Sequence, residues 1–359
     1  MAHKINTDDD FDPKTVVYTP SQVATYGLNS VRLAKETYES GAGITVPIAE
    51  IREYMPPVEP GKLAAIIAQT SNYKSGLMHF MERMSATDLA EKDDKKHILI
   101  HVSVEESVED QAYLELARES GEYAGDLSRG IVQDWNKLEE SAIRIGEVPI
   151  YRIGDSLARS ENMPLLYISN MVRAINDLVG GKVLDWQPKV AGIFFDYLQA
   201  FPIDPVFRAE SRDSQRRMQV RDDIYKLRML ANKYMCPVFV AVQAKQHLEG
   251  AHPPIMLPGQ YDGEESSSIA QRCDRIVTLW MPKSTHAIGD EIRTKSLTFA
   301  VEDNQLMIKI VKQRGMLPSG KQWMCRVNFQ TNTIALETDN DRRAKNYVDI
   351  PEHWYDRHD

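Results

Sequence analysis

The sequence predicts an α/β fold in which a central, mainly parallel sheet is flanked by helices. Two apolar runs predict it. Leu63–Ala68 is apolar throughout and is followed by a polar turn at residues 69–73 and by a segment with helical spacing that begins at Lys74. Residues 190–199 form the second run, VAGIFFDYLQ. Short runs without polar alternation are typical of strands buried on both faces of a parallel sheet.

The first run leads into a candidate phosphate-binding loop. In the layout strand, loop, Lys-Ser and helix, loop amides and the helix N-terminus face an anion, while Lys and Ser reach phosphate and magnesium. Compared with the pattern GxxxxGK(S/T), Ala68 and Tyr73 stand where glycines are usual. A bulky residue at Tyr73 costs about 1 to 3 kcal/mol if its φ is positive. A plain strand-turn-helix with a solvated Lys is the alternative. The candidate nucleotide-binding residues are Ala68, Gln69, Thr70, Ser71, Asn72, Tyr73, Lys74 and Ser75.

Composition limits the class of protein. At 359 residues and 42% hydrophobic, the chain can bury a full α/β core. We expect a cytoplasmic protein without a membrane partner, because no apolar run is long enough to span a bilayer and the N-terminus lacks signal-peptide character. The net charge of -9 argues against a generally basic surface but leaves room for a local basic channel.

Cysteine and histidine spacing gives no metal site. The three cysteines are widely spaced among apolar neighbours, which favours packing thiols. His97 and His101 have HxxxH spacing, but in a strand they lie roughly 13 Å apart. They are therefore expected to be ordinary polar positions.

At the N-terminus, residues 1–20 are acidic and lack apolar periodicity, so we expect a flexible arm. Residues 21–39 have roughly helical spacing of apolar positions. A single amphipathic helix needs a cover for its apolar side. Its own domain or a neighbouring subunit could supply that cover.

Polar side chains follow three predicted strands. The run at residues 97–104 ends in Glu105 and Glu106, which lie at the strand edge where open α/β sheets bind ligands. One carboxylate could polarise a water molecule, or both could cap the helix predicted over residues 108–119. Asp196 stands at the C-terminal end of the apolar part of the run 190–199 and could hold the water shell of magnesium, so Ser75 and Asp196 are the candidate metal residues. Gln243 ends the strand predicted at 237–242 and could sense a γ-phosphate or orient water.

The middle of the chain reads as mostly helical over residues 120–189, with a short strand at 148–153 and a helix at 167–179. Trp135, Leu138, Ala142 and Ile145 share one helical face. Residues 207–217 form a predicted basic loop that leads into a helix at 218–233. Its arginines could contact a phosphate backbone or form a solvated face; they are Arg208, Arg212, Arg216 and Arg217.

The remaining elements are a long polar loop at 244–268, strands at 275–281 and 306–311, an alternating hairpin at 323–336, and a charged tail at 337–359. The strand at 306–311 leads directly into Lys312 and Arg314.

Taken in order, these motifs resemble the RecA-like motor domain of DnaB-family hexameric replicative helicases. The similarity covers about residues 43–329. The motifs that carry it are AQTSNYKS, VSVEE, FFDYLQ, PVFVAVQ, YDGEESSSIAQRCDRIV and IVKQRG. The helical segment WNKLEESAIRIGEVPIY is also family-like.

The resemblance implies a RecA-like P-loop NTPase core at 43–336 with an N-terminal linker helix at 21–42, and it implies ATP and Mg²⁺ as cofactors. Lys74 and Ser75 match the phosphate-binding Lys and the magnesium-binding hydroxyl, and Asp196 matches the Walker B acid. The catalytic set is Glu105 as the carboxylate, Gln243 as the γ-phosphate sensor, and Lys312 and Arg314 as residues supplied in trans. A basic pair that one subunit supplies to the nucleotide of the next, called a finger, requires a homo-oligomer. The resemblance implies a hexamer that acts on single-stranded DNA.

The same resemblance marks the central loops as DNA-binding and a loader or primase as a possible partner. The candidate DNA-binding residues are Arg208, Arg212, Arg216, Arg217, Lys245, Glu265, Ser266 and Ser267. Three departures are visible: Tyr73 replaces a glycine, Glu264 and Ser267 stand where the family has Arg and Gly, and the family's N-terminal primase-engaging domain has no counterpart. The function implied is an ATP-dependent DNA helicase, and the alternative is a RecA-like scaffold or regulatory module with impaired hydrolysis.

Overall fold

The computed structural model describes residues 18–39, 43–92, 94–154, 166–207, 211–245, 256–263, 267–293, 298–315 and 320–337. Contacts divide the chain into two units, Met1–Ala42 and Gly43–Asp359. In the first unit, the described residues form helix α1 (Pro20–Glu39), and large apolar side chains at Val23, Tyr26 and Val31 are exposed.

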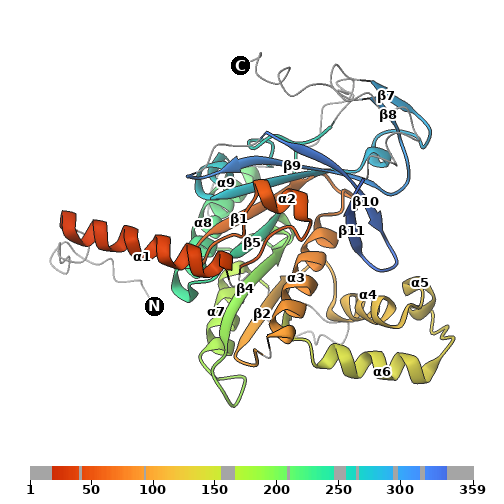
Figure 1. Cartoon of the computed structure of the whole chain (residues 1–359), viewed down its shortest axis with the longest axis horizontal. Coiled ribbons are helices and arrows are strands. Elements are labelled where there is room, and N and C mark those ends of the chain that lie inside the picture. Colours follow the sequence, from red (N-terminus) through yellow and green to blue (C-terminus); the bar gives the residue numbers. More distant parts are fainter. Residues whose placement is uncertain are drawn as a thin grey trace. The chain divides into compact units, whose positions relative to one another are not determined.

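The second unit is built on a nine-stranded sheet with the order β11-β10-β9-β6-β1-β5-β4-β2-β3 (Figure 1). Six neighbouring strands run parallel, from β3 through β2, β4, β5 and β1 to β6, and β9, β10 and β11 continue the sheet in antiparallel pairs. This confirms the predicted mainly parallel sheet. The strands are β1 (Leu63–Ala68), β2 (His97–Ser103), β3 (Ile150–Gly154), β4 (Lys189–Asp196), β5 (Val238–Gln243), β6 (Arg275–Trp280), β9 (Gln305–Gln313), β10 (Gln322–Asn328) and β11 (Thr333–Leu336).

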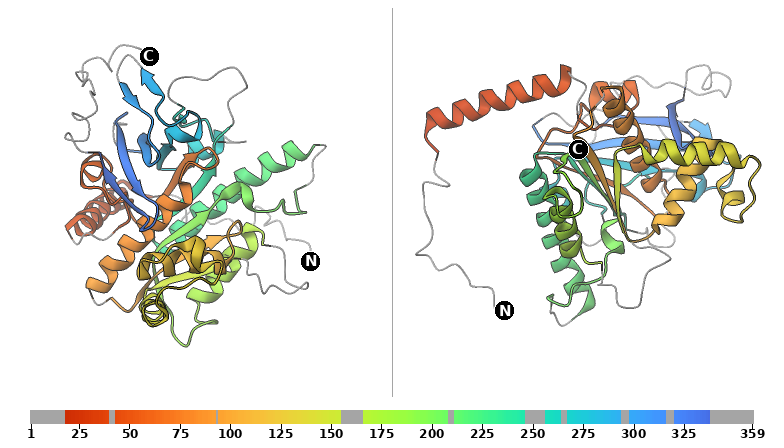
Figure 2. Two further views of the ribbon diagram at one scale, coloured as in Figure 1. Left: turned by 90° about the vertical axis from the view of Figure 1, so that its right-hand side faces the viewer. Right: turned by 90° about the horizontal axis from the view of Figure 1, so that it is seen from below.

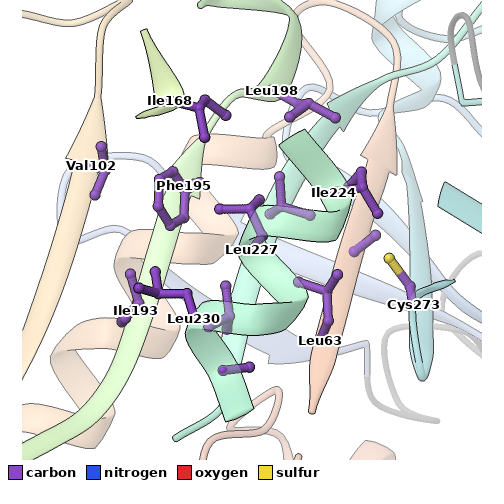
Figure 3. Close-up of a cluster of buried hydrophobic side chains, with 14 of the residues drawn as sticks. Leu63, Val102, Ile168, Ile193, Phe195, Leu198, Ile224, Leu227, Leu230 and Cys273 are labelled. Atoms are coloured by element: carbon purple, nitrogen blue, oxygen red, sulfur yellow. The ribbon is translucent and has the colours of Figure 1, made fainter. Parts of the chain in front are cut away.

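Helices cover both faces of the sheet (Figure 2). Helices α7 (Ile168–Val179), α8 (Arg212–Tyr234) and α9 (Ser267–Arg272) pack on one face, while α2 (Ala49–Tyr54) and α3 (Lys74–Glu91) pack on the other. Figure 3 shows the first of these cores, where Ile193 and Phe195 of β4 lie near Leu227 of α8. Because successive strand residues point to opposite faces, Phe194 instead joins the core under α3.

The strand register decides which side chains meet at the carboxyl edge. Ala68 at the end of β1 pairs with Gln243 at the end of β5, and Ser103 at the end of β2 pairs with Asp196 at the end of β4. All four strands are parallel neighbours, so the segments that follow them emerge along one edge. Open α/β sheets bind ligands at this edge.

Several predicted boundaries need correction. The stretch 212–217 is not a loop but the first turns of α8, and Ser267 belongs to α9 rather than to a loop. Strand β4 ends at Asp196, and a 3-10 turn (Leu198–Ala200) follows it. On α6 (Trp135–Gly146), Trp135 remains 62% exposed, so the predicted apolar face is not fully covered.

Smaller elements complete the unit: helices α4 (Val108–Ser120) and α5 (Ala124–Leu127), a 3-10 turn at Pro282–Ser284, and a two-stranded sheet of β7 (Glu291–Arg293) and β8 (Thr298–Ala300). The cysteines Cys236, Cys273 and Cys325 are free and buried, as predicted for packing thiols. Among the described residues, no helix combines the length and apolarity that a bilayer crossing requires.

Candidate nucleotide site

The loop between β1 and α3 curls tightly at residues 69–73. Ser71 and Tyr73 both adopt left-handed backbone conformations, with φ of 61° and 65°. The buried Asn72 holds the curl in place, because its Oδ1 accepts hydrogen bonds from the Met281 amide (2.7 Å) and from the Ser284 hydroxyl (3.1 Å). Its Nδ2 donates to the carbonyl of Thr70 at 2.8 Å. The loop is therefore tied to the end of β6 and leads straight into the N-terminus of α3, whose first amides lack intrahelical acceptors.

Tyr73 occupies the glycine position of the phosphate loop in the conformation that glycine favours. Its ring lies against Gly76, makes an edge contact with Phe329 at 5.8 Å between centroids, and its hydroxyl donates to Asn332 Oδ1. Asn332 Nδ2 in turn donates to the Gly76 carbonyl at 3.0 Å. Burial raises the pKa of Tyr73 to about 12, so the hydroxyl stays protonated. The ring is thus held by α3 and by the turn between β10 and β11.

Lys74 is buried and lies across the loop. Its Nζ donates to the carbonyls of Ala68 (3.3 Å) and Gln69 (3.0 Å) and to Gln243 Oε1 (3.2 Å). Burial lowers the pKa of Lys74, and the charges of Asp196 and Glu105 oppose that shift. The ammonium therefore sits between the loop and the carboxylates of the neighbouring strands.

Asp196 and Ser75 fit a magnesium site. Asp196 is 2% exposed at the end of β4, and its Oδ1 has no hydrogen-bond partner among the described residues. Burial raises the pKa of Asp196, while nearby His101 and a hydrogen bond with the Ser75 side chain lower it. A buried carboxylate oxygen without a partner beside a hydroxyl is a donor set suited to a hard cation.

Glu105 and Gln243 lie at the same edge. Glu105 follows β2 and is exposed; burial of part of the side chain and the charges of Asp196 and Glu106 raise its pKa, and Lys74 lowers it. Gln243 lies between β1 and β4, and its Nε2 donates to Thr70 Oγ1 at 2.7 Å while its Oε1 accepts from Lys74. Gln243 therefore links the loop to the neighbouring strand. Gln199 is a further residue of this edge that was not predicted from the sequence: its Oε1 accepts from the Gln243 amide at 2.9 Å.

Lys312 and Arg314 lie elsewhere. β9 runs antiparallel to β6 and ends beside Arg275, where β6 begins. This is the amino edge of the parallel strands, opposite the phosphate loop. Lys312 Nζ donates to the Ala270 carbonyl, and Arg314 Nη2 donates to the Gln271 carbonyl. Within one chain these two residues do not join the site.

The candidate DNA-binding residues divide into three groups. Arg208, Glu265 and Ser266 lie outside the described residues. Arg212, Arg217, Lys245 and Ser267 are exposed, and the Lys245 carbonyl accepts from Gln69 Nε2 at 3.4 Å, which places its backbone beside the phosphate loop. Arg216 instead binds the carbonyls of Phe201 (2.8 Å) and Gln199 (3.2 Å), so it fastens the start of α8 to the segment after β4.

The prediction that His97 and His101 are ordinary polar positions is correct for His97 and wrong for His101. His97 is partly exposed and contacts Asp94 at 2.6 Å. His101 is not an ordinary polar position: it is 1% exposed and contacts Glu82 of α3. Its neighbours, His79 and Glu82, have the i, i+3 spacing of one helical face, and that spacing is the signal in the sequence that could have found them.

Comparisons with known proteins agree with this architecture. An ATPase domain of known structure superimposes with a TM-score of 0.65 at 13% sequence identity, covering 90% of this chain and 100% of that chain. A DnaB-like replicative helicase, described with its interactions with primase, gives a TM-score of 0.62 at 16% identity, covering 87% of this chain and 66% of that chain. At these identities the likeness shows the fold, which is the RecA-like fold that the sequence predicted.

The sequence itself assigns the family. No curated protein sequence shows a significant match to the chain. The sequence pattern of the DnaB-like helicase C-terminal domain, however, matches residues 43–338, which is most of the chain and includes every strand of the central sheet. The chain therefore belongs to the DnaB-like helicase C-terminal domain family.

Proposed function

We propose that this chain is the ATP-hydrolysing motor of a ring-forming helicase that moves along single-stranded DNA during replication. One observation carries the proposal. Four neighbouring parallel strands bring Lys74, Asp196, Glu105 and Gln243 to one edge, beside a loop curled for an anion. Family membership supports the helicase type.

ATP binding would use groups that now face one another. The Lys74 ammonium exchanges the carbonyls of Ala68 and Gln69 for phosphate oxygens, since a charged acceptor makes the stronger hydrogen bond. The amides at the start of α3 face the same anion. Ser75 and Asp196 would hold Mg²⁺, which screens phosphate charge when bound.

Hydrolysis needs a base and a way to detect the γ-phosphate. Glu105 accepts a proton from the attacking water. Its raised pKa suits that task, because a general base works best when its pKa is closer to the pH of the reaction. Gln243 contacts both Lys74 and Thr70. When Lys74 turns to phosphate, Gln243 loses one of these two contacts and can transmit the change along β5.

The basic pair requires a second subunit. Lys312 and Arg314 lie at the amino edge, so they can stabilise developing charge only at the site of an adjacent copy. Such a finger is worth on the order of 10³ to 10⁵ in rate. The proposed assembly is a hexamer in which residues 21–42 link neighbours and residues 43–336 form the motor. The exposed apolar side chains of α1 suit that linking role.

DNA contact is proposed for the exposed residues Arg212, Arg217, Lys245 and Ser267, and for Arg208, Glu265 and Ser266. A primase or a helicase loader is a proposed partner. The support is the solved relative that is described with primase.

The first test measures ATPase rate with and without single-stranded DNA, on a sample of known mass in solution. Hydrolysis should rise with DNA and be abolished by Lys74→Ala. Lys182→Ala is the matched control, because Lys182 is exposed and pairs only with Asp177 in the described structure. DNA-independent or absent hydrolysis by the wild-type chain would contradict the proposal.

The second test asks whether the basic pair acts in trans. Lys74→Ala and Arg314→Ala chains should each be inactive alone, and mixing them should restore part of the ATPase rate, because some interfaces then combine an intact loop with an intact finger. If mixtures that form rings show no recovery, Arg314 does not act across subunits.

A second candidate function is a RecA-like scaffold with impaired hydrolysis. The observation that favours it is the left-handed Tyr73. The two candidates differ in the response to Tyr73→Gly: a large gain in ATP affinity would mean that the native loop is impaired, and a loss would mean that Tyr73 has a role of its own.

A further inference from the structure

A cluster of three potential metal ligands lies buried between α3 and β2. We call His79, Glu82 and His101 the α3–β2 cluster. Their exposed fractions are 3%, 1% and 1%. His79 and Glu82 stand one turn apart on α3, on a face that looks onto the sheet, and His101 points toward them from the middle of β2.

The ligand atoms converge. Each residue offers one nitrogen or carboxylate oxygen, and these three atoms all lie within 4.8 Å of one another. His79 Nδ1 is 3.4 Å from Glu82 Oε2, and His101 Nδ1 contacts Glu82 Oε1. The two imidazoles are stacked, with an interplanar angle of 19°, and the Nδ1 atom of each ring faces an oxygen of the Glu82 carboxylate.

The cluster lacks hydrogen-bond partners that its burial calls for. Within the described part of the chain, His79 Nε2 and His101 Nε2 have no hydrogen-bond partner, and His79 Nδ1 and Glu82 Oε2 have only the 3.4 Å contact with each other. A buried polar atom left without a partner destabilises the folded chain, because it has given up its hydrogen bonds to water. Two buried nitrogens without a partner, beside a pair joined only by a long contact, indicate that something besides these side chains completes the site.

We infer that the α3–β2 cluster binds one divalent transition-metal ion of the zinc class. Two imidazole nitrogens and a carboxylate are a ligand set that Zn²⁺ accepts, and a carboxylate that uses both oxygens supplies a fourth donor. Mg²⁺ and Ca²⁺ prefer oxygen ligands and suit this set poorly. The ion would be separate from the magnesium proposed at Ser75 and Asp196.

The surroundings fit such a site. Glu106 Oε2 lies 3.8 Å from His79 Nε2, on the side of the ring away from Glu82. Metal-bound histidines usually donate their second N–H to a carboxylate, and a small shift of Glu106 makes that bond. The ion would hold α3, which begins with Lys74, against β2, which ends two residues before Glu105. Its role is therefore structural, because it holds two parts of the candidate nucleotide site at a fixed distance.

The test is the metal content of the full chain, purified without added metal, then unfolded and refolded with Zn²⁺ or with Co²⁺ and passed through a desalting column. We expect about one equivalent of metal per chain. The Co²⁺ form should show the absorption bands of a low-symmetry, nitrogen- and oxygen-ligated ion. Chelation should lower the thermal midpoint, and Zn²⁺ should restore it.

His79→Gln and His101→Gln should each lose the bound metal. His97→Gln is the matched control, since His97 lies on the same strand and outside the cluster, and this variant should keep it. Wild-type protein that refolds without retaining metal, or a thermal midpoint that chelator leaves unchanged, would overturn the inference. The three side chains would then interact only through hydrogen bonds and charge, without a metal ion. These readouts do not involve ATP, so they are independent of the proposed motor activity.

Discussion

Replacing Gly76 with alanine is expected to destabilise the phosphate loop only while Tyr73 is present. A Cβ at Gly76 would lie 2.5, 2.6 and 2.7 Å from three carbons of the Tyr73 ring. These distances are far inside van der Waals contact, and the ring cannot move away freely because Asn332 and Phe329 hold it. Overpacking of this kind costs about 1 to 3 kcal/mol.

A double-mutant cycle isolates this clash. Alanine is a better helix former than glycine by about 1 kcal/mol, and this gain is present with either residue at position 73, so it cancels in the cycle. The single variant Tyr73→Gly relieves a left-handed conformation, worth about 1 to 2 kcal/mol, but loses the packing of a half-buried ring. The coupling energy between the two substitutions should therefore be about 1 to 3 kcal/mol, with the double variant less destabilised than the sum predicts.

Urea unfolding of the wild type, the two single variants and the double variant measures the coupling energy. ATP titration of the same four proteins shows whether ATP affinity changes together with stability. The control is Gly146→Ala at the end of α6, where a Cβ meets nothing within 4 Å. Its effect should be the same whether position 73 carries tyrosine or glycine. If the substitutions at Tyr73 and Gly76 add to within about 0.5 kcal/mol, the ring does not constrain the loop and the reasoning is refuted.

Three further outcomes are expected. Burial raises the pKa of Asp223 to about 7, so the folded chain binds the carboxyl proton more tightly than the unfolded chain does. The stability that this proton contributes is fully present below about pH 4 and is lost as the pH rises toward 7. Asp223→Asn should flatten this pH dependence and be more stable than wild type above pH 7 by roughly 2 to 4 kcal/mol in urea unfolding; an unchanged profile contradicts the assignment. Burial also raises the pKa of Cys236 and Cys273 to about 12, so neither thiol should react with a thiol reagent at neutral pH until the chain unfolds. Arg217→Ala should weaken single-stranded DNA binding and reduce its salt dependence without changing stability, whereas Arg216→Ala should lower stability by about 1 to 3 kcal/mol because two carbonyls lose a charged donor; equal effects of the two on DNA would remove the distinction.

Much of the sheet could be predicted because its strands are buried on both faces. Leu63–Ala68 has the predicted bounds, and its side chains are all buried. Such runs stand out without knowledge of their neighbours. Polar residues at their ends, Asp196 and Gln243, were then placed correctly by the rule that parallel strands share a carboxyl edge.

Other local features were harder to read. Helix α8 begins six residues before the predicted start, at Arg212, because its first turn is exposed and carries no apolar periodicity. Its capping residue was a usable signal: the Ser211 side chain accepts from the Ser214 amide at 3.2 Å. The two-stranded sheet of β7 and β8 has strands of three residues each, which are too short to give a pattern.

The order of the longer strands of the central sheet, the position of the Lys-Ser loop and the family could be predicted from the sequence alone, because these depend on patterns among residues close together in the chain. The roles of Tyr73 and His101 became visible only in the folded protein. Tyr73 is held by Asn332, which is 259 residues away, and His101 faces a carboxylate on another element. Contacts of this kind depend on strand register and helix packing, and spacing along the chain does not encode either one.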